Sequence, residues 1–213
     1  MMWNDAIAGF LEICNENTDR SMTDFEAAAL AAGVPIIRND SQQLIRVLLQ
    51  IRQPQHILEI GTAVGFSAVL MARSAPQARI TTIELDTDRY REAGQNFIKW
   101  QVADRIDSIL GDANEILRQL TGQFDFIFLD GAKGQYLHQI DRLAALLTEG
   151  GILLADNVLQ DGEAALSRFA VARRDRTIHK RMRAFIEAVH CDERFDAVTL
   201  ATGDGMLLAR KKH

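Results

Sequence analysis

The fold is decided by one stretch, His56-Ile57-Leu58-Glu59-Ile60-Gly61-Thr62-Ala63-Val64-Gly65-Phe66-Ser67. Its first five residues predict a buried strand, and a helical stretch at 66–74 follows after a turn with two glycines. Glycines let the backbone turn sharply and approach a ligand, and the beginning of a helix offers free N–H donors. We therefore expect a strand, a ligand-binding loop and a helix here, with a plain strand-to-helix turn as the alternative.

The same alternation of strand and helix continues along the chain. Apolar runs predict strands at 80–84, 106–110, 124–129 and 152–155, separated by helices at 87–100, 114–120 and 135–147. Apolar strands joined by helix-length crossovers predict a parallel sheet covered on both faces. Two late strands, 197–200 and 205–208, flank a glycine-rich turn and predict a hairpin. The expected fold is α/β, a seven-stranded Rossmann-like sheet that is mostly parallel and ends in an antiparallel hairpin.

Residues 1–52 predict a helical extension packed on the domain formed by 53–213. A first helix carries one apolar stripe, a second begins near Ser21 and Asp24 and ends at Gly33, and a third begins at one of residues 39–41. The stripe of the first helix consists of Trp3, Ile7, Phe10, Leu11 and Cys14.

Composition excludes several classes of protein. The chain has 213 residues, 47% of them hydrophobic and 25% charged, which is typical of one soluble globular domain. The longest apolar run, at 27–37, is too short to cross a bilayer, and no leader-like segment opens the chain. Cys14 and Cys191 lack a metal or redox spacing, so we expect reduced thiols and a cytoplasmic protein without membrane contact. A net charge of −5 argues against general nucleic-acid binding.

Three loops at the carboxyl ends of the strands predict a nucleoside site. Gly61 and Gly65 are preceded by Glu59, which favours a ligand with an ammonium or sulfonium group over the pyrophosphate of a dinucleotide. Glu84 ends the second strand, where an acid accepts the hydroxyls of a ribose. Asp112 accepts from an adenine amine or caps the next helix. A solvent-exposed acid is the alternative for Glu84.

The next two strands end in residues that a nucleoside site does not need. Asp130 directly follows the fourth strand, and Asp156 and Asn157 directly follow the fifth. These are hard oxygen ligands that suit Mg²⁺, Mn²⁺ or Ca²⁺ better than Zn²⁺. Lys133 is a candidate general base beside such an ion. The alternatives are helix caps for the acids and a surface charge for the lysine.

Together these motifs resemble the cation-dependent O-methyltransferases, the relatives of catechol and caffeoyl-CoA O-methyltransferases that use S-adenosylmethionine. The resemblance runs from about residue 34 to the C-terminus and implies a class I methyltransferase fold. Within the family, the segment 129–136 is most similar to the bacterial tRNA 5-hydroxyuridine methyltransferases. The plant enzymes carry a third acid, and the catechol enzymes a bulky aromatic, where this chain has Ala132.

The resemblance implies a role for each matching residue. Asp130, Asp156 and Asn157 hold the cation, Lys133 acts with Asp130 in catalysis, and a homodimer forms in part through the N-terminal helices. Tyr136 lines the site, with a packed helix aromatic as the alternative. The implied cofactor-binding residues are Ile37, Glu59, Gly61, Ser67, Glu84, Asp112, Ala113, Asp130 and Tyr136.

Two substrates offer the vicinal oxygens that such an ion chelates: a catechol, and 5-hydroxyuracil through its 5-hydroxyl and 4-oxo groups. Seven basic residues at 168–183 stand against one acid, Asp175, and favour RNA. A solvated helix face, or pairing with acids across a dimer interface, is the alternative. The candidate RNA-binding residues are Arg173, Arg174, Arg176, Lys180 and Arg183.

The sequence thus predicts a Mg²⁺-dependent, S-adenosylmethionine-dependent O-methyltransferase that converts 5-hydroxyuridine to 5-methoxyuridine in tRNA. Methylation of a small catechol-like or phenolic compound is the first alternative. A nucleoside-binding sensor is disfavoured by Asp130, Asp156 and Asn157, and a nicotinamide oxidoreductase by the loop after the first strand.

Overall fold

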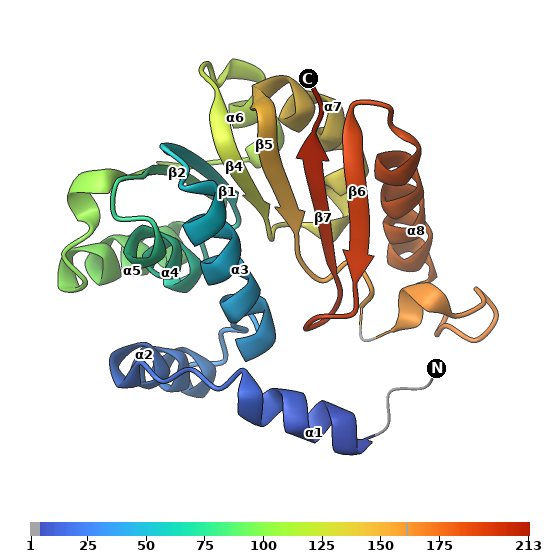
Figure 1. The fold of residues 1–213 in the computed structure, drawn as a ribbon, viewed down its shortest axis with the longest axis horizontal. Coiled ribbons are helices and arrows are strands. Elements are labelled where there is room, and N and C mark those ends of the chain that lie inside the picture. Colours follow the sequence, from blue (N-terminus) through green and yellow to red (C-terminus); the bar gives the residue numbers. More distant parts are fainter. Residues whose placement is uncertain (1–4, 161) are drawn as a thin grey trace.

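The computed structural model describes residues 5–160 and 162–213, so Trp3 lies outside the described residues. One seven-stranded sheet runs through the molecule, with helices on both of its faces (Figure 1). Its strands lie in the order β3-β2-β1-β4-β5-β7-β6. They are β1 (His56–Ile60), β2 (Arg79–Glu84), β3 (Ile106–Leu110), β4 (Phe124–Leu129), β5 (Leu147–Ala155), β6 (Phe195–Leu200) and β7 (Met206–Lys211).

Strands β1 to β5 are parallel, and β7 is antiparallel to both of its neighbours. The predicted α/β fold with a C-terminal hairpin is confirmed. The hairpin folds back so that β7 pairs with β5, which leaves β6 at the edge. Strand β5 begins at Leu147, earlier than predicted. The sequence did not indicate its first half because residues 148–151 are polar or glycine and do not form an apolar run.

The helices are divided between two hydrophobic cores. They are α1 (Asp5–Cys14), α2 (Arg20–Ala31), α3 (Asn39–Arg52), α4 (Phe66–Ser74), α5 (Thr87–Lys99), α6 (Ala113–Gln119), α7 (Tyr136–Leu146) and α8 (Arg176–Cys191). Short 3₁₀ turns lie at η1 (Ala103–Arg105), η2 (Lys133–Gln135) and η3 (Glu163–Ala165). Helices α2 to α5 cover one face of the sheet, and α6 to α8 cover the other.

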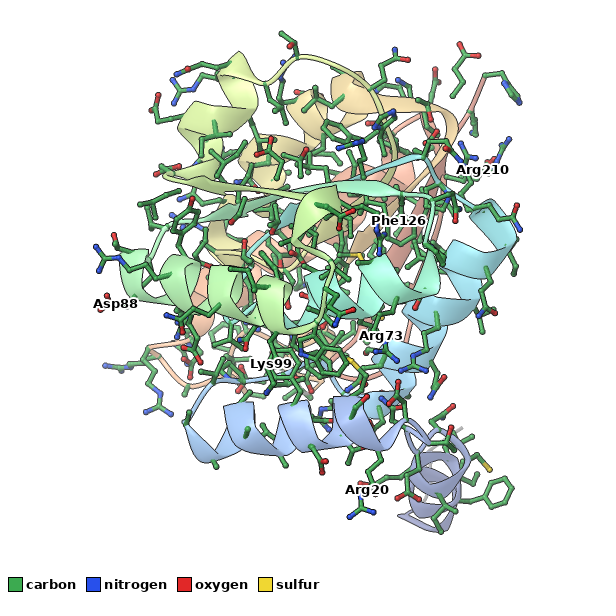
Figure 2. All side chains as sticks on the ribbon, turned by 90° about the vertical axis from the view of Figure 1, so that its left-hand side faces the viewer. Arg20, Arg73, Asp88, Lys99, Phe126 and Arg210 are labelled. Carbon is green, nitrogen blue, oxygen red and sulfur yellow. The ribbon has the colours of Figure 1, made fainter. Side chains whose placement is uncertain are left out.

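Strand β4 contributes side chains to both hydrophobic cores. Phe126 and Phe128 belong to the core under α2 to α5, whereas Ile127 and Leu129 belong to the core under α6 to α8. Figure 2 shows Phe126 in the interior, while Asp88 projects outward from α5. Because successive side chains of a strand point to opposite faces, a strand buried on both sides is apolar throughout. This explains the unbroken apolar runs of the sequence.

The N-terminal helices differ in how they are packed. Met22 and Phe25 of α2 and Ile45 and Leu49 of α3 are buried in the core with α4. Helix α1 lies at the edge of the molecule against α3, and its Phe10 is 65% exposed (Figure 1). No helix within the described residues is long and apolar enough to cross a membrane.

Asp125 fastens the end of α3 to the sheet. Its carboxylate accepts hydrogen bonds from the backbone N–H groups of Gln55 and His56, at 2.7 and 3.1 Å, and from Arg52 Nη2 at 3.1 Å.

We expect Asp125→Ala to lower the free energy of unfolding by about 2 kcal/mol. Hydrogen bonds to a charged group contribute about 1.5–3 kcal/mol, and solvent partly screens the carboxylate of Asp125. Urea denaturation measures the change. Asp88→Ala, at a 93% exposed side chain, is the matched control; equal stability of both variants would contradict the expectation.

Candidate active site

A cavity of about 660 Å³ lies at the carboxyl ends of the parallel strands. Its volume is typical of sites for small molecules and cofactors. It is lined by the residues after β1, β2, β3, β4 and β5 and by the loop before α3. The structure brings ten predicted site residues to its wall: Ile37, Gly61, Ser67, Glu84, Asp112, Ala113, Asp130, Lys133, Asp156 and Asn157.

Backbone hydrogen bonds continue across the edge of the sheet past the ends of the strands. Gly61 N donates to Ile83 O at 3.0 Å, and Asp130 N donates to Ile60 O at 2.9 Å. Gly61 adopts φ +101°, and a Cβ atom at this position would collide with the carbonyl oxygen of Asp130. Glycine is therefore required where the loop after β1 meets the loop after β4.

Glu84 is held at the cavity wall by backbone donors. Its Oε2 accepts from Ala63 N at 2.8 Å, and its Oε1 accepts from Leu85 N and Asp86 N, both at 2.9 Å. Each carboxylate oxygen has further lone pairs for hydroxyl donors. This buried acid therefore ties the glycine loop to the end of β2 and suits the two hydroxyls of a ribose.

Glu59 does not line the cavity, contrary to the expectation of direct cofactor contact. Its side chain is fully buried and accepts hydrogen bonds from Ser67 Oγ and Thr82 Oγ1, both at 2.5 Å. Burial raises the pKa of Glu59 to about 7, although the two hydroxyl donors oppose the shift. Glu59 is thus a positioning residue that joins β1, β2 and the first turn of α4.

Asp112 caps the next helix and also lies at the wall of the cavity, and its contact with an adenine amine stays a prediction. Its Oδ1 accepts from Asn114 N at 2.7 Å, so it caps α6, and it also lines the cavity together with Ala113. Ile37 lines the cavity from the loop before α3. Its carbonyl oxygen accepts a hydrogen bond from Gln42 Nε2 at 2.9 Å.

Two acids lie at the adjacent ends of β4 and β5, Asp156 buried and Asp130 half-buried. Burial and the nearby Asp156 raise the pKa of Asp130 well above its usual value. Burial, with a contribution from Asp204, raises the pKa of Asp156 to about 6. Two acids that share a dry site disfavour each other's charged form, and a bound cation relieves that cost.

The amide of Asn157 completes the candidate ligand set. Asn157 has φ +56°, and its Nδ2 donates to Asp204 Oδ2 at 3.2 Å, which leaves the amide oxygen available to ligate a cation. Within residues 5–160 and 162–213, no three carboxylate, imidazole or thiol groups form a metal cluster by themselves. The site therefore depends on this amide oxygen, and the all-oxygen donor set suits a hard divalent ion.

Lys133 lies beside both acids. It begins the turn η2, lines the cavity, and its positive charge partly offsets the raised pKa values of Asp130 and Asp156. A lysine at this place is close to any substrate oxygen that approaches the two carboxylates. The geometry fits a proton-accepting role better than an isolated surface charge.

Tyr136 does not line the cavity, contrary to the expectation from the resemblance. Its side chain is fully buried, its hydroxyl donates to Leu129 O at 3.2 Å, and its ring packs against Phe185 at 5.4 Å between centroids. Tyr136 lies in the first turn of α7, and its side chain points into the core, where it packs beneath the end of β4. The alternative of a packed helix aromatic is the correct one.

The sequence analysis missed an ion pair at the rim of the cavity. Arg38, just before α3, pairs with Asp204, in the turn between β6 and β7, at 2.5 Å, and both line the cavity. Asp40 Oδ2 fixes the same turn by accepting from Gly203 N at 2.7 Å. Residues 202–205 had indicated only a hairpin turn, and no local signal connects them with a helix 163 residues earlier in the chain.

The candidate RNA-binding residues separate into two groups. Arg176 Nε donates to Val171 O at 3.1 Å and Arg183 Nη1 donates to Ala164 O at 2.8 Å, so these two side chains hold the loop before α8. Arg174 pairs with Asp175 at 3.2 Å, while Arg173 and Lys180 are exposed. That these five residues bind RNA stays a prediction, and Arg183 is itself exposed.

Comparison with known proteins identifies the family. The family model described as O-methyltransferase matches residues 21–212. The chain belongs to the O-methyltransferase family. A catechol O-methyltransferase of Mycobacterium tuberculosis is 32% identical over 160 residues, 73% of this chain and 73% of the relative. Caffeoyl-CoA O-methyltransferase 1 of Eucalyptus globulus is 31% identical over 185 residues, 81% of this chain and 73% of the relative.

Solved structures of methyltransferases share the fold of this O-methyltransferase. Cofactor-bound Rv0187 from MTB superposes with a TM-score of 0.83 at 26% identity and covers all of both chains, 100% each. An O-methyltransferase from Bacillus cereus, solved with SAH, has a TM-score of 0.83 at 24% identity and covers 97% of both chains, which shows the shared fold. The predicted methyltransferase fold and enzyme class are confirmed.

The raised pKa of Glu59 predicts a pH-dependent stability. Between the unfolded pKa near 4.5 and the folded pKa near 7, the native state binds more protons than the unfolded state, so its stability falls as the pH rises through this window. The loss above pH 7 approaches about 3 kcal/mol. In Glu59→Gln this contribution is absent, so the variant gains stability relative to the wild type between pH 5 and 8.

Urea denaturation of both proteins at pH 5 and 8 measures this gain. Because ionised Glu59 also raises the pKa of Asp130, the difference reports Glu59 together with its coupling to Asp130. Parallel pH profiles would show that Glu59 is ionised in the native state throughout.

Proposed function

We propose that this O-methyltransferase is divalent-cation-dependent, uses S-adenosylmethionine and methylates 5-hydroxyuridine in tRNA. The observation that carries the cation dependence is the pair of acids with raised pKa values, half-buried Asp130 and buried Asp156, with the amide of Asn157 next to Asp156 in the chain. The proposal of the methyl donor is supported by the glycine loop at Gly61, by Glu84 and by the family.

The chain's own residues divide the chemistry between two walls of the cavity. On one wall, Glu84 and the loop 61–65 bind and orient the methyl donor, whose sulfonium supplies an activated methyl group. On the other, Asp130, Asp156 and Asn157 would hold a cation, which acidifies a hydroxyl and fixes its direction when it is bound. Lys133 accepts the hydroxyl proton, and the oxygen attacks the methyl carbon as the carbon–sulfur bond breaks.

The tRNA substrate is supported by the surroundings of the cavity. A wobble base with a 5-hydroxyl and a 4-oxo group presents the two neighbouring oxygens that the ligand set can engage. Arg173, Lys180 and Arg181 are exposed on or next to α8, and Arg181 Nη1 reaches the carbonyl oxygen of Gly134 at 3.5 Å, directly after Lys133. Positive side chains at the rim of an acidic site suit a phosphate backbone.

A small catechol-like substrate is the second candidate. It is favoured by the relatives, which include proteins named catechol and caffeoyl-CoA O-methyltransferases. Both substrates use the same chelating oxygens, so the ligand set does not discriminate between them.

We also propose a homodimer. Phe10 and Ile13 of α1 are 65% and 73% exposed in one chain, and a second copy would cover them. Light scattering on the wild type and on Phe10→Asp tests this: we expect dimers for the wild type and monomers for the variant, and equal masses would refute the proposal.

Transfer of labelled methyl groups tests the substrate. The protein is incubated with labelled S-adenosylmethionine and Mg²⁺, and with bulk tRNA from cells that lack it, with catechol in a parallel reaction. We expect label in 5-methoxyuridine of the digested tRNA. Rapid methylation of catechol without label in tRNA would establish the second candidate.

Metal binding is expected to depend on Asp156 and on pH. Ligation needs both carboxylates. Because the pKa of Asp156 is about 6 without a cation and that of Asp130 is also raised, the apparent affinity for Mg²⁺ rises from pH 5.5 to 8. A chelator abolishes activity and Mg²⁺ restores it.

Asp156→Asn binds Mg²⁺ at least roughly 100-fold more weakly, because losing a metal ligand costs more affinity than losing a residue that only hydrogen-bonds to a ligand. Calorimetric titration at pH 5.5 and 8, with Asp88→Asn as control, measures both effects; retained affinity would refute the site.

Lys133→Ala is expected to lower kcat about 100-fold or more, the usual contribution of a general base, and to leave the dissociation constant of S-adenosylmethionine unchanged. Steady-state kinetics and equilibrium dialysis measure the two quantities. Lys99→Ala, at an exposed lysine on α5, is the control (Figure 2). An unchanged kcat would make Lys133 an ordinary rim charge.

A further inference from the structure

The most exposed large apolar side chain among the described residues lies in the loop between β5 and α8. Phe169 is 88% exposed, and its neighbours from 167 to 170 are all exposed as well. Single exposed apolar side chains are common on protein surfaces, so exposure alone assigns no role to this ring. Its position within the cationic stretch of an otherwise acidic chain is what distinguishes it. The segment 167–170 is called the Phe169 turn below.

The Phe169 turn is held rigidly on both sides. Before it, the carbonyl oxygen of Leu166 accepts from His179 Nε2 at 3.1 Å, and that of Ala164 accepts from Arg183. After it, Val171 is buried and its carbonyl oxygen accepts from Arg176. Within it, Phe169 N donates to Ser167 Oγ at 3.2 Å and Ala170 N donates to Ser167 O at 2.9 Å.

Arg176 and Arg183 thus anchor the loop on the two sides of an exposed ring. A ring presented on a preorganised turn loses little conformational freedom when it binds, so more of the contact energy remains as affinity.

The Phe169 turn belongs to the same edge of the molecule as the active site. The loop that carries it begins at Asn157, and Val158 N and Leu159 N donate to Gly205 O and Asp204 O at 2.9 and 3.0 Å. Figure 1 shows this orange segment at the same end of the sheet as the hairpin turn between β6 and β7. The ring thus stands on a loop that leaves the ligand set directly.

The chemistry of the turn fits single-stranded RNA. An aromatic face stacks on any unpaired base, and arginine or lysine side chains around it neutralise phosphates. Arg168, Arg173 and Lys180 are exposed next to it in the chain or on the adjoining turn of α8. An enzyme that modifies a base takes that base out of its stack, which leaves neighbouring bases in need of a new partner.

We infer that Phe169 is the stacking platform for an unpaired base next to the methylated nucleotide, with Arg168, Arg173 and Lys180 as its phosphate contacts. The inference rests on the proposed RNA substrate and identifies the element that grips it. Phe169 is a specificity-determining residue: it serves a nucleic acid and is dispensable for a small phenol.

Kinetics with two substrates test the inference. The RNA is a hairpin with 5-hydroxyuridine in its loop, and the small substrate is catechol. We expect Phe169→Ala to raise KM for the hairpin roughly ten- to hundredfold, the usual effect of losing one stacked base, and to leave kcat/KM for catechol unchanged. Phe169→Trp retains the wild-type KM. Ile98→Ala, at a 71% exposed side chain on α5, is the matched control and changes neither substrate.

Binding measurements add a readout that a structural role would not move. By fluorescence anisotropy, Arg168→Gln weakens hairpin binding and makes the slope of log affinity against log salt shallower by about one unit. Phe169→Ala weakens binding without changing that slope.

The outcomes separate the two proposals. If the wild type methylates the hairpin and Phe169→Ala does so equally well, the stacking inference is wrong while the RNA substrate stands. If the wild type methylates only catechol, the RNA substrate falls and the inference falls with it. If Phe169→Ala instead impairs catechol turnover, or dissociates a homodimer with unchanged RNA kinetics, the turn serves the small substrate or a protein interface and the inference is overturned.

Discussion

Gly61 packs against the carbonyl group of Asp130 so closely that no Cβ atom fits between them. Strands β1 and β4 are parallel neighbours, with Ile60 opposite Leu129, so both end at the same level of the sheet. The loop that approaches the methyl donor and the loop that carries the first acid therefore touch through their backbones. This contact sets the distance between the methyl donor and the methyl-accepting substrate, because neither loop can move without displacing the other.

Charge is the second constraint on the site. Asp156 raises the pKa of Asp130, Asp204 raises the pKa of both, and Lys133 offsets only part of these effects. Burying acids in this way costs stability unless a cation or protons neutralise them. The cation of our proposal would therefore also stabilise the protein, since a ligand that binds only the native state adds to its stability.

The sequence predicted the strands and the acids that directly follow them, because an apolar run and the residue at its end lie together in the chain. It failed where the direction of a side chain decides the outcome. Glu59 lies one residue before the end of β1, and its carboxylate points into the face under α4, while Leu58 and Ile60 point into the other core. Tyr136 turns into the core because it begins α7. The pair of Arg38 and Asp204 escaped prediction because only the packed hairpin joins them.

The basic stretch before and within α8 shows why a count of charges does not identify a binding surface. Arg176 and Arg183 each donate to a backbone carbonyl group of the preceding loop, which leaves fewer of their donors for a partner. Arg168, Arg173 and Lys180 stay exposed around a ring that no core covers. The buried carboxylates can serve any substrate with two neighbouring oxygens, so discrimination between a phenol and a nucleotide must come from outside the ligand set. Our proposals place that discrimination in the loop that follows Asn157, which carries an exposed ring and exposed cations instead of acids.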